Sequence, residues 1–185
     1  SKPTDPLRIG WTGAPWTRPD DLALLRVLAR WIAERPQQLR LVHVGHAEGR
    51  LSLAQALQLP AETVEVHHLN GHAEYLQQLN FDIGLAPLSQ SSFNHYKSAI
   101  KPIEYSCLGI PWIASDSEPY RELCEQWQWQ GRLCSEPSEW ISHVQALSDR
   151  AMRSREGLAV RQLCQQHASY ASGVESWRQL LASKH

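Results

Sequence analysis

The chain has 185 residues, with 18 Lys and Arg against 19 Asp and Glu and a formal net charge of -1. This length suits one domain that buries its own core, and the balanced charge excludes the basic surface that binds nucleic acid or an anionic membrane. No apolar run approaches the roughly 18 residues that a membrane helix needs, and the N-terminus lacks the regions of a signal peptide. We therefore expect a cytoplasmic protein with no transmembrane segment.

Short strand-like apolar runs alternate with helical patterns along the chain. The runs that favour strands cover residues 7–11, 39–44, 64–69, 82–88 and 111–115. This alternation is typical of parallel strands joined by crossover helices. We predict an α/β fold, a Rossmann-like parallel sheet with helices on both faces, over residues 7–170 after a leader over residues 1–6.

The helices are predicted from their apolar spacing. The clearest repeat places one face on Leu24, Val27, Leu28, Trp31 and Ile32. Thr17 with Asp20 resembles a capping pair at the start of that helix. Further helices are expected over residues 50–58, 73–80, 102–108, 118–127 and 137–149. The tail from 151 to 184 has the pattern of two more helices, broken near Gly173, so the domain is expected to end in a helical C-terminal tail whose last helix covers 171–185.

Three residue types invite a special role. The four cysteines, at positions 107, 124, 134 and 164, form no CxxC pair and predict reduced, mostly buried thiols. The histidines at 43, 46, 67, 68 and 72 lack a Cys or acidic residue at matching spacing, so we expect no metal site. Trp127 and Trp129 fit either core packing, which is favoured because Trp is highly buried on average, or a platform that stacks on carbohydrate.

The stretch KSAIKPIEYSCLGIPWIAS, residues 97–115, follows the fourth predicted strand. Parallel sheets bind ligands outside the carboxyl ends of their strands, so this segment is a candidate site. Pro102 fits the first helical position, which places the helix start near Lys101. Gly109 is expected to end the helix as a C-cap before the next strand.

The start of this helix combines cations with a carboxylate. Lys97, Ser98 and Lys101 lie at or before the helix N-terminus, where unpaired N–H groups and the helix dipole favour an anion. Glu104 follows in the first turn and can reach a neutral hydroxyl beside that anion. The alternative is that both lysines are solvated and Glu104 only complements the helix N-terminus, a contribution of about 0.3–1 kcal/mol.

The same stretch, preceded by FDIGLAPLSQSSFN, resembles the C-terminal half of a group 1, or family 4, retaining glycosyltransferase of the two-domain GT-B type. The resemblance extends back to RIGWTGAP, LVHVGH and VEVHHLNGHAEYLQQL, and covers about residues 7 to 120. It implies the half that binds a nucleoside-diphosphate sugar, the donor substrate, without a further cofactor. It also implies a second, acceptor-binding domain on the N-terminal side of a full-length parent.

The family pattern has two glutamates eight residues apart. Glu104 falls at the second, whose implied role is to hold the ribose hydroxyls. Tyr96 stands at the first, which is a departure from the pattern. The implied catalytic residues are therefore Lys97, Lys101 and Glu104, with Ser98 beside them, and the lysines would stabilise the departing nucleoside diphosphate.

The loops after the first and third strands supply the remaining donor-binding candidates. Gly13 permits close backbone approach to a phosphate, and Arg18 is either a clamp on the diphosphate or an exposed residue at a helix start. Asn70 and Gly71 stand where the family contacts the base, although a plain turn has the same residues. Asp116, Glu118 and Tyr120 follow the last predicted strand, and either reach a ligand or cap the next helix.

The resemblance and the length together lead to one function and two alternatives. The chain has no room for the acceptor half, so we expect it to bind the donor without efficient transfer. The first alternative is a non-catalytic nucleotide- or phosphate-binding module with a degenerate glycosyltransferase fold. The second is an interaction domain that docks through its helical tail.

Overall fold

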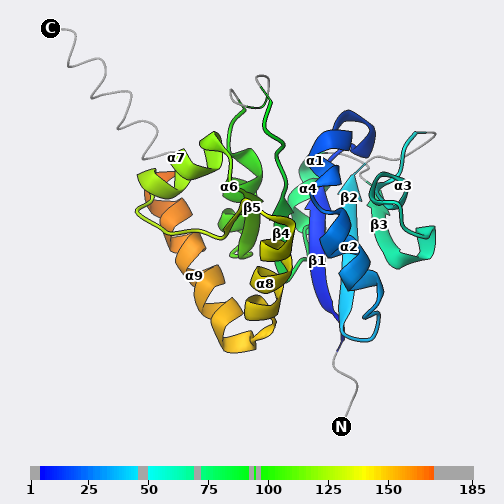
Figure 1. The fold of residues 1–185 in the computed structure, drawn as a ribbon. Coiled ribbons are helices and arrows are strands. Elements are labelled where there is room, and N and C mark those ends of the chain that lie inside the picture. Colours follow the sequence, from blue (N-terminus) through cyan, green and yellow to red (C-terminus); the bar gives the residue numbers. More distant parts are fainter. Residues whose placement is uncertain (1–4, 46–49, 69–71, 92–93, 95–96, 169–185) are drawn as a thin grey trace, which may run out of the picture.

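A computed structural model describes residues 5–45, 50–68, 72–91, 94 and 97–168. Six strands and the helices around them make up this part of the chain (Figure 1). The strands are β1 (Leu7–Thr12), β2 (Leu39–Gly45), β3 (Val64–His68), β4 (Ile83–Ala86), β5 (Trp112–Ser115) and β6 (Leu133–Cys134). The α-helices are α1 (Pro19–Ala23), α2 (Arg26–Ala33), α3 (Leu53–Leu57), α4 (His72–Gln78), α6 (Ile100–Cys107), α7 (Glu118–Gln126), α8 (Pro137–Ser148) and α9 (Arg150–His167). Two short 3-10 turns cover Pro15–Thr17 and Ala61–Thr63.

The strands form one sheet in the order β3-β2-β1-β4-β5-β6, and every neighbouring pair is parallel. The chain builds outward from β1 to β3, and then crosses to β4 on the other side of β1. This reversal creates a switch point between β1 and β4. The predicted Rossmann-like sheet is confirmed, and β6, which the sequence analysis missed, adds two residues beside β5 at the edge.

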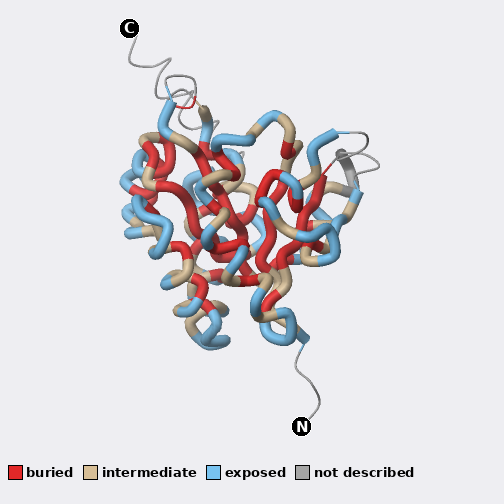
Figure 2. The backbone as a smooth tube through the Cα atoms, turned by 45° about the vertical axis from the view of Figure 1, so that its right-hand side comes forward, coloured by how far each residue is buried: buried red, intermediate tan, exposed pale blue. Residues whose placement is uncertain are grey.

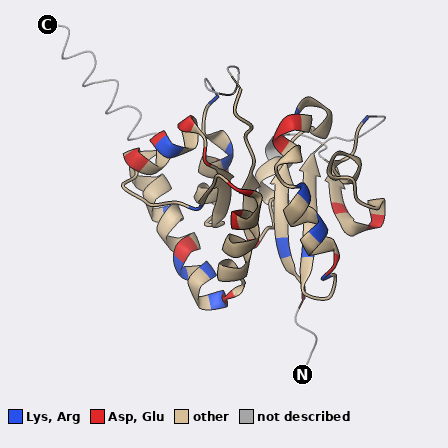
Figure 3. Cartoon of the chain, viewed as in Figure 1, with Lys and Arg blue, Asp and Glu red and all other residues tan. Residues whose placement is uncertain are grey.

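Helices cover both faces of the sheet because alternate strand residues point to opposite sides. In β4, Ile83 and Leu85 belong to a core with α1, α2, α3 and α8, whereas Ala86 belongs to a core with α6, α7 and α9. Figure 2 shows the buried segments gathered in the interior of the molecule, with exposed segments around them. Segments of positive and negative charge are interspersed over the ribbon (Figure 3), as the net charge leads one to expect.

The first predicted helix differs from the structure in phase. Leu24 and Val27 are 36% and 49% exposed, so the predicted face is wrong at these positions. The helix is interrupted between Ala23 and Arg26, and the face that is buried carries Leu25, Leu28 and Ile32. The predicted Thr17 cap is also wrong, because Arg18 is the N-cap of α1 and the Thr17 hydroxyl donates to Ala14 O within the preceding turn (2.9 Å).

Helix α6 begins earlier than predicted. Its first residue is Ile100, so Pro102 is the third helical residue rather than the first. Proline is tolerated there because the first N–H groups of a helix have no partner within the helix. The predicted stop is confirmed: Gly109 has φ +71°, and the N–H groups of Gly109 and Ile110 donate to Ser106 O and Tyr105 O, each at 2.9 Å.

Two aromatic residues fix α6 to the sheet. The Tyr105 hydroxyl donates to Leu85 O (3.1 Å), and its ring lies where a Cβ on Gly84 would stand, 2.5 Å from the nearest ring atom. The Trp112 Nε1 donates to Ser106 Oγ (2.9 Å). These contacts hold the second turn of α6 against β4 and β5.

The predicted tail helix beginning near residue 151 is present as α9, which starts at Arg150. The predicted break at Gly173 and the helix over 171–185 lie outside the described residues. Within the described part of the chain, no helix has both the length and the apolar character needed to cross a membrane.

Candidate functional site

Lys101 lies at the switch point of the sheet. Its ammonium donates to Thr12 O and to Thr12 Oγ1 (3.1 Å), at the end of β1. The ammonium is 5.4 Å from the centroid of the Trp11 ring, and a Cβ built on Gly13 would stand 3.5 Å from it. The first turn of α6, which follows β4, thus places its cation against the last residue of β1.

Burial lowers the pKa of Lys101 to about 8, against an opposing effect of the Glu104 carboxylate, and nearby Arg18 lowers the pKa further. Among the described residues, no carboxylate lies within 4 Å of the ammonium. The Glu104 and Asp21 carboxylates compensate this charge only in part, because burial still lowers the pKa. A buried cation of this kind is further stabilised by an anion that enters beside it.

A small cavity of about 60 Å³ adjoins this cation. Arg18 from the loop after β1, Lys97 and Ser98 from the segment before α6, and Lys101 all line it, together with Trp11 and Tyr120. Four predicted site residues therefore converge from separate segments. The cavity is far smaller than the roughly 300–1,000 Å³ of complete ligand pockets, so it has room for only one small group.

Asp21, which the sequence analysis missed, organises this cavity. The residue is only 5% exposed, and its Oδ1 accepts hydrogen bonds from Ser89 N (2.8 Å), Ser89 Oγ (2.7 Å) and Asn94 Nδ2 (2.9 Å). Its Oδ2 lies 3.9 Å from Lys97 Nζ. Asp21 therefore ties helix α1 to the loop after β4 and helps to place Lys97.

Glu104 is held by a second residue that the sequence did not reveal. The Tyr75 hydroxyl, from α4, donates to Glu104 Oε2 (2.8 Å) and lies 3.0 Å from Thr12 Oγ1. Burial raises the pKa of Tyr75, so the hydroxyl keeps its proton as a donor. The carboxylate is thus oriented by a chain of contacts that ends at the same threonine as Lys101.

Gly13 has a conformation that favours glycine, with φ +140°. Its carbonyl accepts a hydrogen bond from His43 Nε2 (2.9 Å), which fixes the loop against β2. Burial lowers the pKa of His43. The remaining candidates Asn70 and Gly71, as well as Tyr96, lie outside the described residues.

The other sequence candidates have structural partners. His67 Nε2 lies 2.6 Å from Glu65 Oε1, and Asp116 Oδ1 pairs with Arg121 (2.7 Å). In the part of the chain that the structure describes, no group of three or more His, Cys, Asp or Glu side chains is placed to hold a metal. His46 and the side chain of His72 lie outside that part.

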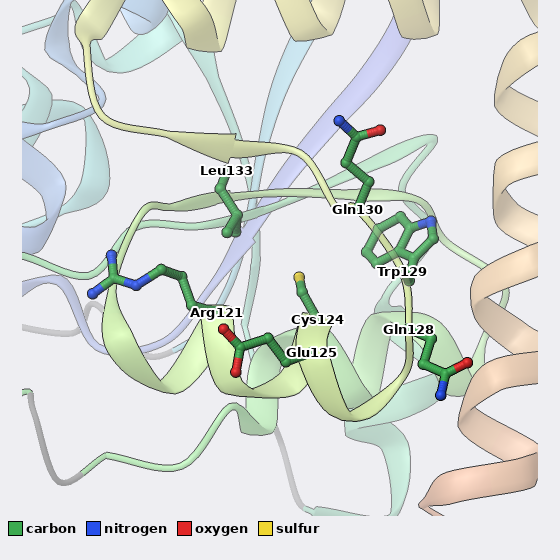
Figure 4. A pocket seen from close by; sticks show the side chains of 7 residues that line it. All are labelled: Arg121, Cys124, Glu125, Gln128, Trp129, Gln130 and Leu133. Atoms are coloured by element: carbon green, nitrogen blue, oxygen red, sulfur yellow. The ribbon is translucent and has the colours of Figure 1, made fainter.

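Two larger cavities lie away from Lys101. One, of about 830 Å³, opens at the amino ends of the strands beside Arg8 and Asp82. The other is an open groove of about 360 Å³ between α7 and β6, where Trp129 and Leu133 form part of the wall (Figure 4). Trp127 is 1% exposed, so it packs in the core as predicted.

Comparisons with known proteins identify the fold. No protein-family model matches the sequence, and no curated protein matches it. Among solved structures, HepE from Anabaena, crystallised with UDP and glucose, has a TM-score of 0.67 and 15% identity over 97% of this chain and 49% of its own. TarM from S. aureus has a TM-score of 0.72 and 14% identity over 96% of this chain and 35% of its own. The C-terminal domain of LpcC, a group 1 glycosyltransferase from Francisella tularensis, has a TM-score of 0.65 and 13% identity over 89% of this chain and 87% of its own.

The sheet order and the covering helices define a Rossmann-like α/β domain. More particularly, the fold is that of the C-terminal domain of GT-B glycosyltransferases, as the sequence resemblance implied. The chain spans about half the length of HepE and about a third of TarM, but most of the LpcC domain.

Proposed function

We propose that the chain binds a nucleoside-diphosphate sugar and forms the donor half of a family 4-like glycosyltransferase. The observation that carries this proposal is the convergence of Arg18, Lys97, Ser98 and Lys101 on one cavity at the switch point. UDP is the first nucleotide to consider, because structures of HepE and TarM contain it.

The proposed chemistry assigns a role to each side chain. The Lys101 ammonium, with Lys97 and Arg18, stabilises the negative charge that develops on the diphosphate as the bond to the sugar breaks. These cations take the place of a metal cofactor. Glu104, oriented by Tyr75, accepts hydrogen bonds from the ribose hydroxyls.

The complete reaction also requires an acceptor. We propose that an N-terminal domain of a longer parent supplies that site, and that the chain by itself binds the donor without efficient transfer. The domain limits, the cytoplasmic location and the retaining outcome stay predictions from the sequence.

One feature of the sequence favours a second candidate, a non-catalytic module. Tyr96 stands in place of the first glutamate of the family pattern. A parent protein that binds nucleoside diphosphates but transfers no sugar would support this candidate, whereas transfer that depends on Lys101 would support the enzyme.

Thermal unfolding with a panel of nucleotides tests the binding step. UDP, GDP, ADP and UDP-glucose are compared with uridine and inorganic pyrophosphate. A nucleotide at 100 times its dissociation constant adds about 2.7 kcal/mol to stability, which raises the melting temperature by roughly 5–10 °C in a chain of this size. If no diphosphate shifts the transition, the donor proposal is wrong.

A further inference from the structure

Helices α6 and α9 approach each other closely at the far end from Lys101. Gly157 in α9 is buried, and a Cβ built on it would stand 2.3 Å from Gly109 O. Only a residue without a side chain permits this approach. Val160 and Cys164 follow Gly157 at three and seven residues, so they share the helix face that α6 covers.

This approach brings two thiols together. Cys107 is the last residue of α6 and is exposed, whereas Cys164 is buried. Their sulfur atoms are 2.8 Å apart. A disulfide bond has a length near 2.05 Å, so bond formation requires the two sulfurs to move together by only about 0.8 Å.

We propose that Cys107 and Cys164 are an oxidisable pair that forms a reversible disulfide between α6 and α9. The structure has all four cysteines as free thiols, three of them buried, as the sequence analysis expected. The proposal is that the protein also has an oxidised form, in which Cys107 and Cys164 are linked. This inference does not rest on the proposed binding of a donor nucleotide.

The exposed thiol is the point of entry for the oxidant, which we take to be a small disulfide such as oxidised glutathione. The Cys107 thiolate attacks one sulfur of that disulfide, and one glutathione thiolate leaves. Cys164 then gives its proton to solvent and attacks Cys107 Sγ, and the second glutathione thiolate leaves. Two protein thiols are oxidised, and the small disulfide is reduced to two thiols.

The second step is expected to be the slower one. Burial raises the pKa of Cys164 to about 12, and its contact with Cys107 acts in the same direction. A mixed disulfide on Cys107 should therefore appear before the protein cross-link. Burial also raises the pKa of Cys124 to about 11 and of Cys134 to about 12, and both residues are buried, so they serve as unreactive controls.

The cross-link would join the helix that carries Lys101 and Glu104 to the last described helix. The two cysteines are 57 positions apart in the chain. A bond that closes a loop of this length restricts the unfolded chain strongly. We expect the oxidised form to melt roughly 5–15 °C above the reduced form.

The test follows the thiols of the unmodified chain. The protein is equilibrated in buffers with increasing ratios of oxidised to reduced glutathione, alkylated with iodoacetamide, digested and analysed by mass spectrometry. The expected product is a linked peptide pair that contains Cys107 and Cys164 and disappears with dithiothreitol. Alkylation of both residues in the most oxidising buffer would overturn the proposal, as would a glutathione adduct on Cys107 that never resolves.

Two variants separate the pair from the other thiols. Cys107→Ser, at an exposed position, should abolish both the cross-link and the rise in melting temperature on oxidation. Cys124→Ala should retain both. If oxidation raises the melting temperature of Cys107→Ser as much as that of the parent chain, other residues cause the rise and the proposal is contradicted. If Cys124→Ala does not fold, the peptide analysis of the parent chain decides between the two results.

Discussion

Cations at the amino ends of the strands, called here the amino edge of the sheet, have different partners from the cation at the carboxyl ends, the carboxyl edge. At the amino edge, the Arg8 guanidinium makes two hydrogen bonds to the Glu65 carboxylate, at 2.9 and 3.1 Å, and the Arg8 N–H donates to Asp82 (2.8 Å). At the carboxyl edge, Lys101 donates to the neutral oxygens of Thr12, and no carboxylate of the described residues lies within 4 Å of it. Arg8 is therefore paired directly with a carboxylate, whereas Lys101 contacts neutral oxygens and is only partly compensated by the more distant Glu104 and Asp21.

The pKa shifts express the same difference. The Arg8 hydrogen bonds are the largest cause that lowers the pKa of Glu65, which is the sign of a satisfied ion pair. Burial lowers the pKa of Lys101, and the Glu104 and Asp21 carboxylates offset this only in part. The larger cavity, of about 830 Å³, lies at the satisfied edge. For this reason the proposed diphosphate site is chosen by charge balance rather than by cavity volume.

Replacing Lys101 and, in a separate variant, Arg8 should produce the largest difference in affinity for a nucleoside diphosphate. Lys101→Met should weaken nucleoside diphosphate binding roughly 10- to 100-fold, because a hydrogen bond to a charged group contributes about 1.5–3 kcal/mol. Its stability should change little, since the lost contacts with Thr12 are offset by the removal of a buried charge. Isothermal titration calorimetry and urea unfolding measure the two effects.

Arg8→Met is the matched control at the other edge. The side chains of Arg8 and Glu65 are 27% and 34% exposed, so solvent screens the pair and its loss should cost only about 1 kcal/mol of stability. Affinity should stay within about twofold of the parent chain. A weaker affinity in Arg8→Met than in Lys101→Met would reverse the assignment of the two edges.

The carboxyl edge was largely predictable because its residues follow strands. Arg18 follows β1, and Lys97, Ser98 and Lys101 lie in the segment after β4 that leads into the first turn of α6. Parallel strands bring the segments that follow them together. Asp21 was not predictable, because its role depends on contacts with a residue 68 positions away. In sequence it has the same appearance as a carboxylate that caps a helix.

Some helix and strand boundaries also could not be predicted, because they depend on contacts that the local sequence does not reveal. Five strands have apolar runs long enough to be predicted, whereas β6 has only two residues and no pattern. Leucines at 22, 24, 25 and 28 allow more than one helical face, so only the interruption between α1 and α2 decides which is buried. Proline is preferred at the first helical position but tolerated at the next ones, which is why the start of α6 was misplaced.

The charge on Lys101 should make binding depend on pH. The pKa of Lys101 is about 8 in the folded chain, below its ordinary value of 10.5, and a bound anion raises it again. Between these values the complex retains a proton that the free chain has lost, so binding takes up a proton and affinity falls by up to tenfold per pH unit. Calorimetry at pH 9 in buffers of different ionisation enthalpy measures this uptake, after correction for titration of the free nucleotide.

The lowered pKa of Lys101 also determines whether the stability of the folded chain rises or falls with pH. Between pH 8 and 10.5 the unfolded chain binds more protons at this residue than the folded chain. The stability that Lys101 contributes relative to Lys101→Met is therefore greatest above pH 10.5 and is lost as pH falls through about 8. Equal pH dependence of the two chains, in both affinity and unfolding, would show that Lys101 is not the titrating group.

The smallest effect should come from Asp21, which acts on the site through another residue. Asp21→Asn retains an acceptor for Ser89 but removes the charge that faces Lys97 at 3.9 Å, so we expect a loss of about 1–2 kcal/mol of stability and a threefold to tenfold weaker affinity. Asp20→Asn, an exposed change in the same first turn, should cost no more than about 0.5 kcal/mol. Hydrogen exchange at the Ser89 amide should accelerate only in Asp21→Asn. Indistinguishable exchange and affinity in the two variants would mean that this buried carboxylate stabilises the loop without placing the cation.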